Sequence, residues 1–304
     1  MPIIKKIIII CIVWFSGESP LFAANNKIAV FYPQSKEPYQ SIYQEIITGI
    51  ESSQQDILVV ELSKDYVAAS ITKELVQKEI NKVIVLGRLG IKLARQLPEN
   101  IHVISGALPI PPGSIDGISL IADPIKLFEY LNTVAPAVKN VHVAFSSENQ
   151  WMIDLAEAAA KKKNLVLKAK LINQTAEAIQ YYNQLFGSLD SSQDSIWLPL
   201  DRVTSHDKVI LPLILEKAWS KEIVVFSSKP SHAKRGALFS TYPDNYLLGQ
   251  QLSKMVNSVA AAPDTPKFAV LDSLQLAVNI RTAAHLGLKY SSDQQKQFKL
   301  TFPE

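Results

Sequence analysis

Short runs of apolar, mostly β-branched residues recur along this chain, and a helical or polar segment follows each run. Continuous apolar runs of this length are typical of strands buried on both faces of a parallel sheet. In the first third of the chain they predict strands at residues 27–33, 56–62, 82–87 and 102–107. Between the first two, apolar residues recur at helical spacing from Tyr39 to Ile50, which predicts a helix that packs on the sheet.

A proline-rich stretch at residues 109–116 interrupts this series, and a helical pattern follows the Asp123-Pro124 step. A second series then predicts strands at 141–147, 165–172, 195–201 and 223–228, with helices near 175–187 and 205–220. Two consecutive series of this kind predict an α/β fold of two doubly wound, Rossmann-like lobes. Because ligands bind at the carboxyl ends of the strands in such sheets, we expect a ligand cleft between the lobes.

Individual side chains predict local details of the second series. Ser147, followed three residues later by Gln150, resembles a capping box at a helix start. The buried face of that helix is predicted to consist of Met152, Leu155, Ala156 and Ala159. Pro212 lies inside the helical pattern near residues 205–220 and is expected to kink or shorten that helix.

The beginning of the chain has the layout of a secretory signal peptide. A lysine pair precedes a short apolar core at residues 7–15, and small residues follow it, so cleavage is predicted after Ala23 or Ala24. The core is shorter than the roughly 20 residues that span a bilayer. We expect residues 1–23 to be a cleavable signal peptide, and the alternative is an uncleaved membrane anchor.

The only cysteine of the chain, Cys11, lies within the predicted signal peptide. The mature protein would then have no disulfide, no thiol nucleophile and no cysteine-based metal site. An exported chain without cysteine suits a bacterial periplasm better than a disulfide-stapled secreted module. We therefore expect a periplasmic protein.

Charge and motif spacing narrow the classes of function. The formal net charge is +3, and no basic block or stripe stands out, so we expect no nucleic-acid partner. The histidines have no metal-ligand spacing, and there is no Gly-x-Ser-x-Gly elbow. We therefore expect no catalytic residues, no metal site and no cofactor, which makes a binding module the better hypothesis than an enzyme.

The last third of the chain carries the most specific motifs. Residues 235–256 contain Gly-Ala-Leu, a turn after Tyr242, and Leu-Gly-x-Gln, and residues 266–288 contain Val278-Asn279, Thr282-Ala283 and Leu286-Gly287-Leu288. These segments resemble the end of the ABC-transporter substrate-binding protein family that includes the tryptophan- and tyrosine-associated periplasmic binding proteins. The Asp123-Pro124 step fits the same family.

The resemblance implies a type I periplasmic binding protein, in which three crossovers join two lobes that close on a small solute. It places residues 25–134 and 238–262 in the first lobe, and residues 135–237 and 263–304 in the second. An amino acid or a related organic anion is the implied solute, and a membrane ABC permease or a membrane sensor protein the implied partner.

The turn at Gly87, Arg88 and Leu89 is implied to face the cleft, where N–H groups at a helix start suit an anionic group. It lacks the spacing of a phosphate-binding loop. The alternative is that its glycines only turn the chain. Family members usually have a small hydroxyl residue where Arg88 stands, and a guanidinium is instead a forked donor for carboxylate or phosphate. Arg88 could also point outward to a partner.

Further ligand-binding candidates lie at strand ends and before the last long helix. They are Tyr32, Gln34, Gly106, Ser146, Ser147, Asp201, Ser227, Ser228 and Tyr242. Asp201 could pair with a ligand ammonium, cap a helix, or pair with Arg202, which stands where family members tend to have Asn. The serines could instead be helix N-caps, and Tyr242 could either stack on a ligand or pack within the fold.

Three functions remain open on the sequence. The protein could capture a small solute and present it to an ABC transporter, or bind a solute and signal to a membrane receptor without transport. The short tail at residues 298–304 slightly favours the second. An α/β enzyme that uses the same cleft is the third.

Overall fold

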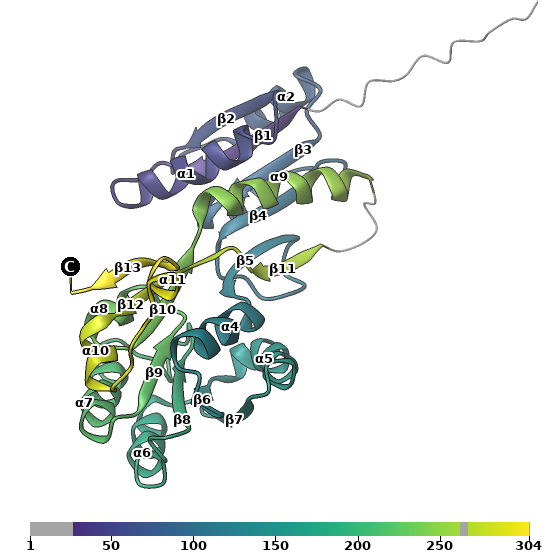
Figure 1. Ribbon diagram of the computed structural model, residues 1–304. Helices are drawn as coiled ribbons and strands as arrows, with labels where there is room; N and C mark the ends of the chain where they lie inside the picture. The colour runs from purple at the N-terminus through teal and green to yellow at the C-terminus, as the bar shows by residue number, and fades with distance from the viewer. Residues whose placement is uncertain (1–26, 262–266, 304) are drawn as a thin grey trace, which may run out of the picture.

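The computed structural model describes residues 27–261 and 267–303, which form two α/β lobes (Figure 1). The first lobe holds a six-stranded sheet in the order β11-β5-β4-β3-β1-β2, and all its pairings are parallel. The strands are β1 (Ile28–Pro33), β2 (Ile57–Leu62), β3 (Lys82–Leu86), β4 (His102–Leu108), β5 (Gly117–Ala122) and β11 (Phe268–Leu271).

Helices cover both faces of the first sheet. They are α1 (Tyr39–Glu51), α2 (Ala68–Gln77), α3 (Gly87–Ala94) and α9 (Asn245–Ala261). Ile28 and Val30 of β1 pack with α1 and α9, whereas Ala29 and Phe31 pack with α2 and α3. This alternation explains why the strands read as continuous apolar runs, because each side chain meets one of two buried layers.

The close contact between α1 and α9 depends on two glycines. A Cβ atom on Gly49 of α1 would overlap the carbonyl oxygen of Tyr246, and one on Gly249 of α9 would overlap that of Ile46. The backbones of two helices that are about 200 residues apart in the sequence therefore touch directly. Any larger side chain at either glycine would push the helices apart.

The second lobe holds a seven-stranded sheet in the order β13-β12-β10-β9-β8-β6-β7. Only the β10–β12 pairing is antiparallel. The strands are β6 (Asn140–Phe145), β7 (Val166–Leu171), β8 (Asp194–Leu198), β9 (Val224–Ser227), β10 (Phe239–Pro243), β12 (Leu274–Asn279) and β13 (Phe298–Phe302). The helices are α4 (Pro124–Val134), α5 (Gln150–Lys162), α6 (Thr175–Leu185), α7 (Ile210–Lys221), α8 (Ser231–Arg235), α10 (Ile280–His285) and α11 (Ser292–Gln295). The core is centred on Trp197, which stacks on Phe226 and meets Phe128 edge-on.

Three crossovers join the lobes, after β5, after β10 and between β11 and β12 (Figure 1). Hydrogen bonds tie them together. The N–H of Asp123 donates to the carbonyl of Leu271 at 2.7 Å, and the N–H of Asp244 donates to the carbonyl of Ser273 at 2.9 Å. The three connections therefore form one short, laterally bonded ribbon between the lobes.

The crossovers lie at positions different from those expected. Helix α4 was expected in the first lobe, but Phe128 and Leu131 lie in the core of the second. Strand β10 was also expected in the first lobe, but it pairs with β9 and β12 of the second sheet. Strand β11 was expected in the second lobe, but it pairs with β5 in the first sheet. Each difference reflects a pairing between segments distant in sequence, which local periodicity does not encode.

Most predicted elements form within two residues of their expected bounds, and the exceptions have simple causes. The capping box at Ser147 does not form, because a 3-10 turn at Ser147–Asn149 precedes α5. Leu155 is exposed, and Ile153 occupies the buried face instead. Helix α7 is shortened and begins at Ile210, so that Pro212 falls in its first turn, where proline is tolerated. Strand β5 was not expected.

The predicted signal peptide, residues 1–23, lies outside the described residues. Within the part of the chain that the structure describes, no helix combines the length and the apolar character needed to cross a bilayer.

Candidate functional site

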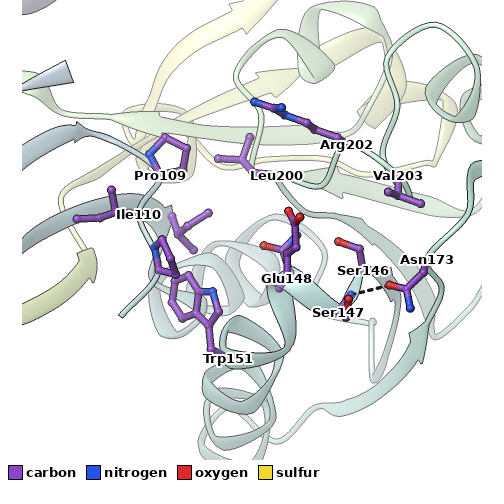
Figure 2. A pocket seen from close by; sticks show the side chains of 13 residues that line it. Pro109, Ile110, Ser146, Ser147, Glu148, Trp151, Asn173, Leu200, Arg202 and Val203 are labelled. Carbon is purple, nitrogen blue, oxygen red and sulfur yellow. Dashed lines mark hydrogen bonds between the residues drawn. The ribbon is translucent and has the colours of Figure 1, made fainter. Parts of the chain in front are cut away.

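A hollow with a volume of about 900 Å³ lies between the lobes (Figure 2). We call it the Arg202 hollow. The first lobe contributes Pro109, Ile110 and Pro111 from the loop after β4, and Ile121 from β5. The second lobe contributes Ser146, Ser147, Glu148, Asn149 and Trp151 after β6, Asn173 after β7, and Leu200, Arg202 and Val203 after β8. Its size lies within the range of small-molecule sites.

Asp201 organises the second-lobe wall from beneath. It is buried, with 5% of its surface exposed, and its two carboxylate oxygens accept five hydrogen bonds. Oδ2 accepts from the N–H and the hydroxyl of Ser146 and from the amide of Asn149, at 2.7–2.8 Å. Oδ1 accepts from the N–H groups of Val203 and Thr204, at 2.8 and 2.9 Å. One carboxylate thus fastens the turn after β6 to the turn after β8.

The same hydrogen bonds determine the ionisation of Asp201. Burial acts to raise the pKa of this carboxyl, but the donors on Thr204, Ser146 and Asn149 outweigh it and hold the pKa below its ordinary value. Among the described residues Asp201 forms no ion pair, with Arg202 or any other side chain, and no oxygen of it lines the hollow. The geometry corresponds to the capping alternative rather than to direct ligand contact.

Polar groups that remain open to a ligand stand above this network. The N–H of Ser147 donates to Oδ1 of Asn173 at 2.9 Å (Figure 2), and both residues line the hollow. Glu148 and Arg202 are exposed on the same wall, and neither forms an ion pair within the described residues. Sequence reasoning missed Glu148 and Asn173, although both follow predicted strands.

In the apolar part of the Arg202 hollow, side chains of the two lobes are in contact. Trp151 of α5 meets Phe268 of β11 edge-on, with ring centroids 5.7 Å apart and an angle of 82° between the rings. Pro109, Ile110 and Leu200 complete this side (Figure 2). The prolines of residues 109–116 were recognised as a loop, but their place at the cleft follows only from the way β4 ends between the lobes.

A second hollow, of about 840 Å³, lies in the first lobe at the carboxyl ends of β1, β2 and β3, and we call it the Arg88 hollow. Its lining includes the predicted residues Gln34, Arg88 and Leu89. It also includes Leu108, the residue directly before Pro109 of the Arg202 hollow. The linings of the two hollows are therefore adjacent in sequence at the end of β4.

The turn that carries Arg88 needs glycine. Gly87 has a φ of 68°, and a Cβ atom there would lie 2.5 Å from the Tyr43 hydroxyl oxygen. Helix α3 begins at this glycine without a side-chain cap. Arg88 is exposed and has no ion pair within the described residues, so its guanidinium is available to a ligand.

The remaining predicted residues line neither hollow. Gly106 packs against Leu252, and Tyr32 packs against the ring of Tyr43. The Ser228 hydroxyl accepts from the indole N–H of Trp197 at 3.0 Å. Tyr242 lies at the end of β10 beside the crossovers, where burial first, and Asp244 and Tyr130 next, raise its pKa to about 12.

Comparison with known proteins identifies the chain. The sequence model described as "ABC transporter substrate binding protein" matches residues 110–297, more than half of the chain. The chain belongs to this ABC transporter substrate-binding protein family. A search of curated proteins found no match.

Solved structures of substrate-binding proteins share the fold. An ABC domain in complex with L-Trp from Streptococcus pneumonia is 19% identical, with a TM-score of 0.55, and the match covers 92% of this chain and 100% of that one. The ligand-free, open structure of a substrate binding protein with adhesive properties from Clostridium difficile is 17% identical, with a TM-score of 0.63 and coverages of 91% and 99%. A conserved domain protein from Vibrio cholerae is 16% identical, with a TM-score of 0.53 and coverages of 90% and 99%. With the two mostly parallel sheets, these matches show the type I periplasmic binding protein fold.

The family of substrate-binding proteins is non-catalytic, although this member contains a serine, a histidine and an aspartate in a hydrogen-bonded row. The Ser227 hydroxyl lies 2.8 Å from Nδ1 of His232, whose Nε2 lies 2.9 Å from Asp207. Ser227 and His232 are completely buried, so no substrate reaches them. The Ser227 hydroxyl donates to the carbonyl of Leu198 at 2.9 Å, which makes it a structural link between β8 and β9. No group of three or more metal-ligand side chains occurs within residues 27–261 and 267–303.

Proposed function

We propose that this protein captures a small molecule between its two lobes and presents it to a membrane ABC permease. The observation that carries the proposal is the Arg202 hollow, which residues of both lobes line. A solute in this hollow touches both lobes at once. Its binding energy then favours the arrangement in which the lobes are closest, and a permease can recognise that arrangement.

The site of action that fits this proposal is the periplasm. The lysine pair, short apolar core and small-residue zone at the start of the chain support export through a cleavable signal peptide, residues 1–23. Amino-terminal sequencing of the protein recovered from a periplasmic extract tests this directly. A new amino terminus at residue 24 or 25 is expected, and an intact amino terminus in the membrane fraction would contradict it.

Ligand capture is tested on the mature protein purified gently from a periplasmic extract. Native mass spectrometry is expected to show a retained small molecule, and a thermal-shift panel of amino acids, nucleosides, sugars and organic acids is expected to show one class that raises Tm. L-tryptophan belongs in the panel because a solved relative contains it. Absence of any retained molecule and of any shift would contradict solute capture.

Closure of the lobes needs its own measurement. Because Cys11 is the only cysteine and lies in the predicted signal peptide, the mature chain can carry two engineered cysteines without a background thiol. Glu99→Cys in the first lobe and Lys208→Cys in the second are both exposed positions outside the hollows. Spin labels at these sites should move closer when ligand is added, and an unchanged distance with bound ligand would contradict closure.

Transport distinguishes this function from solute sensing without transport. Deleting the gene should abolish uptake of the identified ligand, and a chain with a Trp151→Ala substitution should restore uptake only in part, because this ring lines the cleft. Normal uptake in the deletion strain, together with loss of a transcriptional response to the ligand, would instead assign the protein to a sensory system.

A further inference from the structure

The charged side chains that line the two hollows are unevenly balanced. The Arg88 hollow holds three cations and one carboxylate, namely Arg88, Lys64, Lys92 and Asp65. The Arg202 hollow holds one of each, Arg202 and Glu148. The cleft as a whole thus carries four cationic side chains against two carboxylates. In a concave site between low-dielectric walls, this excess favours an anionic ligand.

The two arginines differ from the lysines in what they offer. A guanidinium presents a planar fork of N–H donors that matches a carboxylate or phosphate, and it keeps its charge at every physiological pH. Arg88 and Arg202 are both exposed, and neither forms an ion pair or side-chain hydrogen bond within the described residues. By contrast, Lys92 already lies over the ring of Tyr66. The two free forks therefore have no partner in the protein that a ligand would have to displace.

The positions of the arginines are as informative as their charge. Arg88 stands at the start of α3 in the first lobe, and Arg202 follows β8 in the second. Apolar residues line both hollows beside the arginines, Leu89 and Leu108 in the first and Pro109, Ile110 and Leu200 in the second. A ligand with one charged end would use one arginine only, whereas a ligand charged at both ends with an apolar middle can use both.

We infer that the captured solute is a small organic acid with two anionic groups, one bound by Arg88 of the first lobe and the other by Arg202 of the second. This inference rests on the proposed capture of a solute in the cleft. The attraction between the two anionic groups and the two arginines then draws the lobes together, because each anionic group binds to a different lobe. A diacid then stabilises the closed arrangement more than a monoacid that uses either arginine alone.

Glu148 sharpens the inference, since its carboxylate lines the same hollow as Arg202. A zwitterionic ligand would use it as the partner of an ammonium group, and its removal would weaken binding. A purely anionic ligand is repelled by it, and its removal would strengthen binding. The response of affinity to Glu148→Gln thus has opposite signs for the two classes of ligand.

The test compares acids with neutral molecules of the same shape. Isothermal titration calorimetry with succinate, glutarate and adipate is paired with the corresponding diamides, and L-tryptophan serves as the zwitterion. We expect at least one diacid to bind about tenfold or more tightly than its diamide. Arg88→Ala and Arg202→Ala should each lower the affinity for that diacid by about tenfold or more. Arg88→Lys should retain part of it, because charge remains but the fork is lost.

Arg95→Ala is the matched control. Arg95 is exposed at the other end of α3, outside both hollows, so the variant should bind the diacid as the unchanged protein does. The melting temperatures of all three alanine variants should be close to that of the parent, because within the described residues these exposed side chains form no ion pair and no side-chain hydrogen bond. Equal melting temperatures separate loss of binding from loss of structure.

Two outcomes overturn the inference and leave solute capture intact. One is that neutral compounds or L-tryptophan bind while the diacids do not. The other is that the diacids bind equally well to Arg88→Ala, Arg202→Ala and the parent. If native mass spectrometry and the whole panel show no bound small molecule, the proposed function fails, and this inference fails with it.

Discussion

The two lobes face the cleft with walls of different construction. In the second lobe, the buried carboxylate of Asp201 holds the loops after β6 and β8 by five hydrogen bonds, and the open side chains stand on that fixed base. In the first lobe, the wall carries Arg88, Lys64 and Asp65 on exposed turns without ion pairs among the described residues. Hydrogen bonds hold the second-lobe wall in one shape, whereas the first-lobe wall presents exposed charged side chains.

If the proposed capture of a solute holds, this difference lets a single cleft be both selective and able to close. A preorganised wall loses little conformational entropy when a ligand binds, so it can define the shape of the solute. Long exposed side chains lose rotamer freedom on binding, but they can follow a ligand as the lobes approach.

Acid should act on the whole second lobe before the first. Burial lowers the pKa of His142 and His232, and hydrogen bonds overcome burial to lower the pKa of Asp194, Asp201 and Asp207. Stability from a histidine with a lowered pKa is present above about 6.5 and is lost as the pH falls through its folded-state pKa. Stability from the carboxylates is present above about 4 and is lost below it. Protonation of the histidines and protonation of the carboxylates therefore both destabilise the second lobe at low pH.

Hydrogen exchange measured by mass spectrometry between neutral pH and pH 3 resolves the lobes. Protection of the amides in β6, β8 and β9, relative to their intrinsic exchange rates at each pH, should fall first, and fluorescence should report the same change, because Trp151, Trp197 and Trp219, the tryptophans of the described residues, lie in the second lobe. Tyr43 of the first lobe, whose pKa burial raises, responds only at alkaline pH. Simultaneous loss of protection in both lobes would remove the contrast.

Replacing Asp201 by alanine should destabilise the protein by about 3 kcal/mol, because buried donors on Ser146, Val203 and Thr204 lose their acceptor. Ligand affinity should fall by about tenfold as the wall loses its shape. Chemical denaturation and calorimetry measure the two effects. Asp154→Ala on the exposed face of α5 is the control and should change stability by less than about 0.5 kcal/mol. Full stability of Asp201→Ala would mean that the network does not hold the wall.

Gly87→Ala tests the first-lobe wall and should cost about 2 kcal/mol, because alanine is strained at a φ of 68° and its Cβ meets the Tyr43 hydroxyl. Part of that cost comes from the contact alone. In a Tyr43→Phe background the same substitution should therefore cost less, which a double-mutant cycle measures. An equal cost in both backgrounds would assign the whole effect to the backbone.

The smallest expected effect is that of Glu148→Gln on the affinity for a diacid. Removing one exposed carboxylate from the Arg202 hollow should raise affinity by about threefold, as for a charge pair in high dielectric. The increase should shrink with added salt, because exposed charges are screened. Reduced affinity instead would mean that Glu148 contacts the ligand directly.

The sequence predicted the strands and the first helix well because their signals are local. Each side chain of β1 or β3 is buried in one of two layers, so the apolar runs are continuous. The lobe boundaries could not be read in this way, since β11 joins the first sheet through β5, which lies about 150 residues earlier. Strand β5 itself was missed because it begins directly after a proline-rich loop.

Strand ends identified several residues that line the hollows, but they did not specify the direction in which each side chain faces. Gln34, Arg88, Ser146 and Ser147 follow strands and line the hollows. Ser227 also ends a strand, yet it is covered by His232 of α8. Whether a residue at a strand end faces the cleft or the helix layer depends on the next element, which the sequence does not place. The sequence did not identify Trp151 as a lining residue, because its position in the Arg202 hollow depends on its contact with Phe268 of β11.

Because α9 docks on α1 through Gly49 and Gly249, the first lobe cannot be completed during synthesis until α9 has been translated. A ribosome would make α1 and the first five strands early, but α9 only after residue 245 and β11 only after residue 268. Until then the apolar face around Ile46 and Ile50 has no cover. The first part to be translated thus waits for segments near the end of the chain before its lobe is complete, and a chain that stops before α9 would expose a surface suited to chaperones and proteases rather than to a solute.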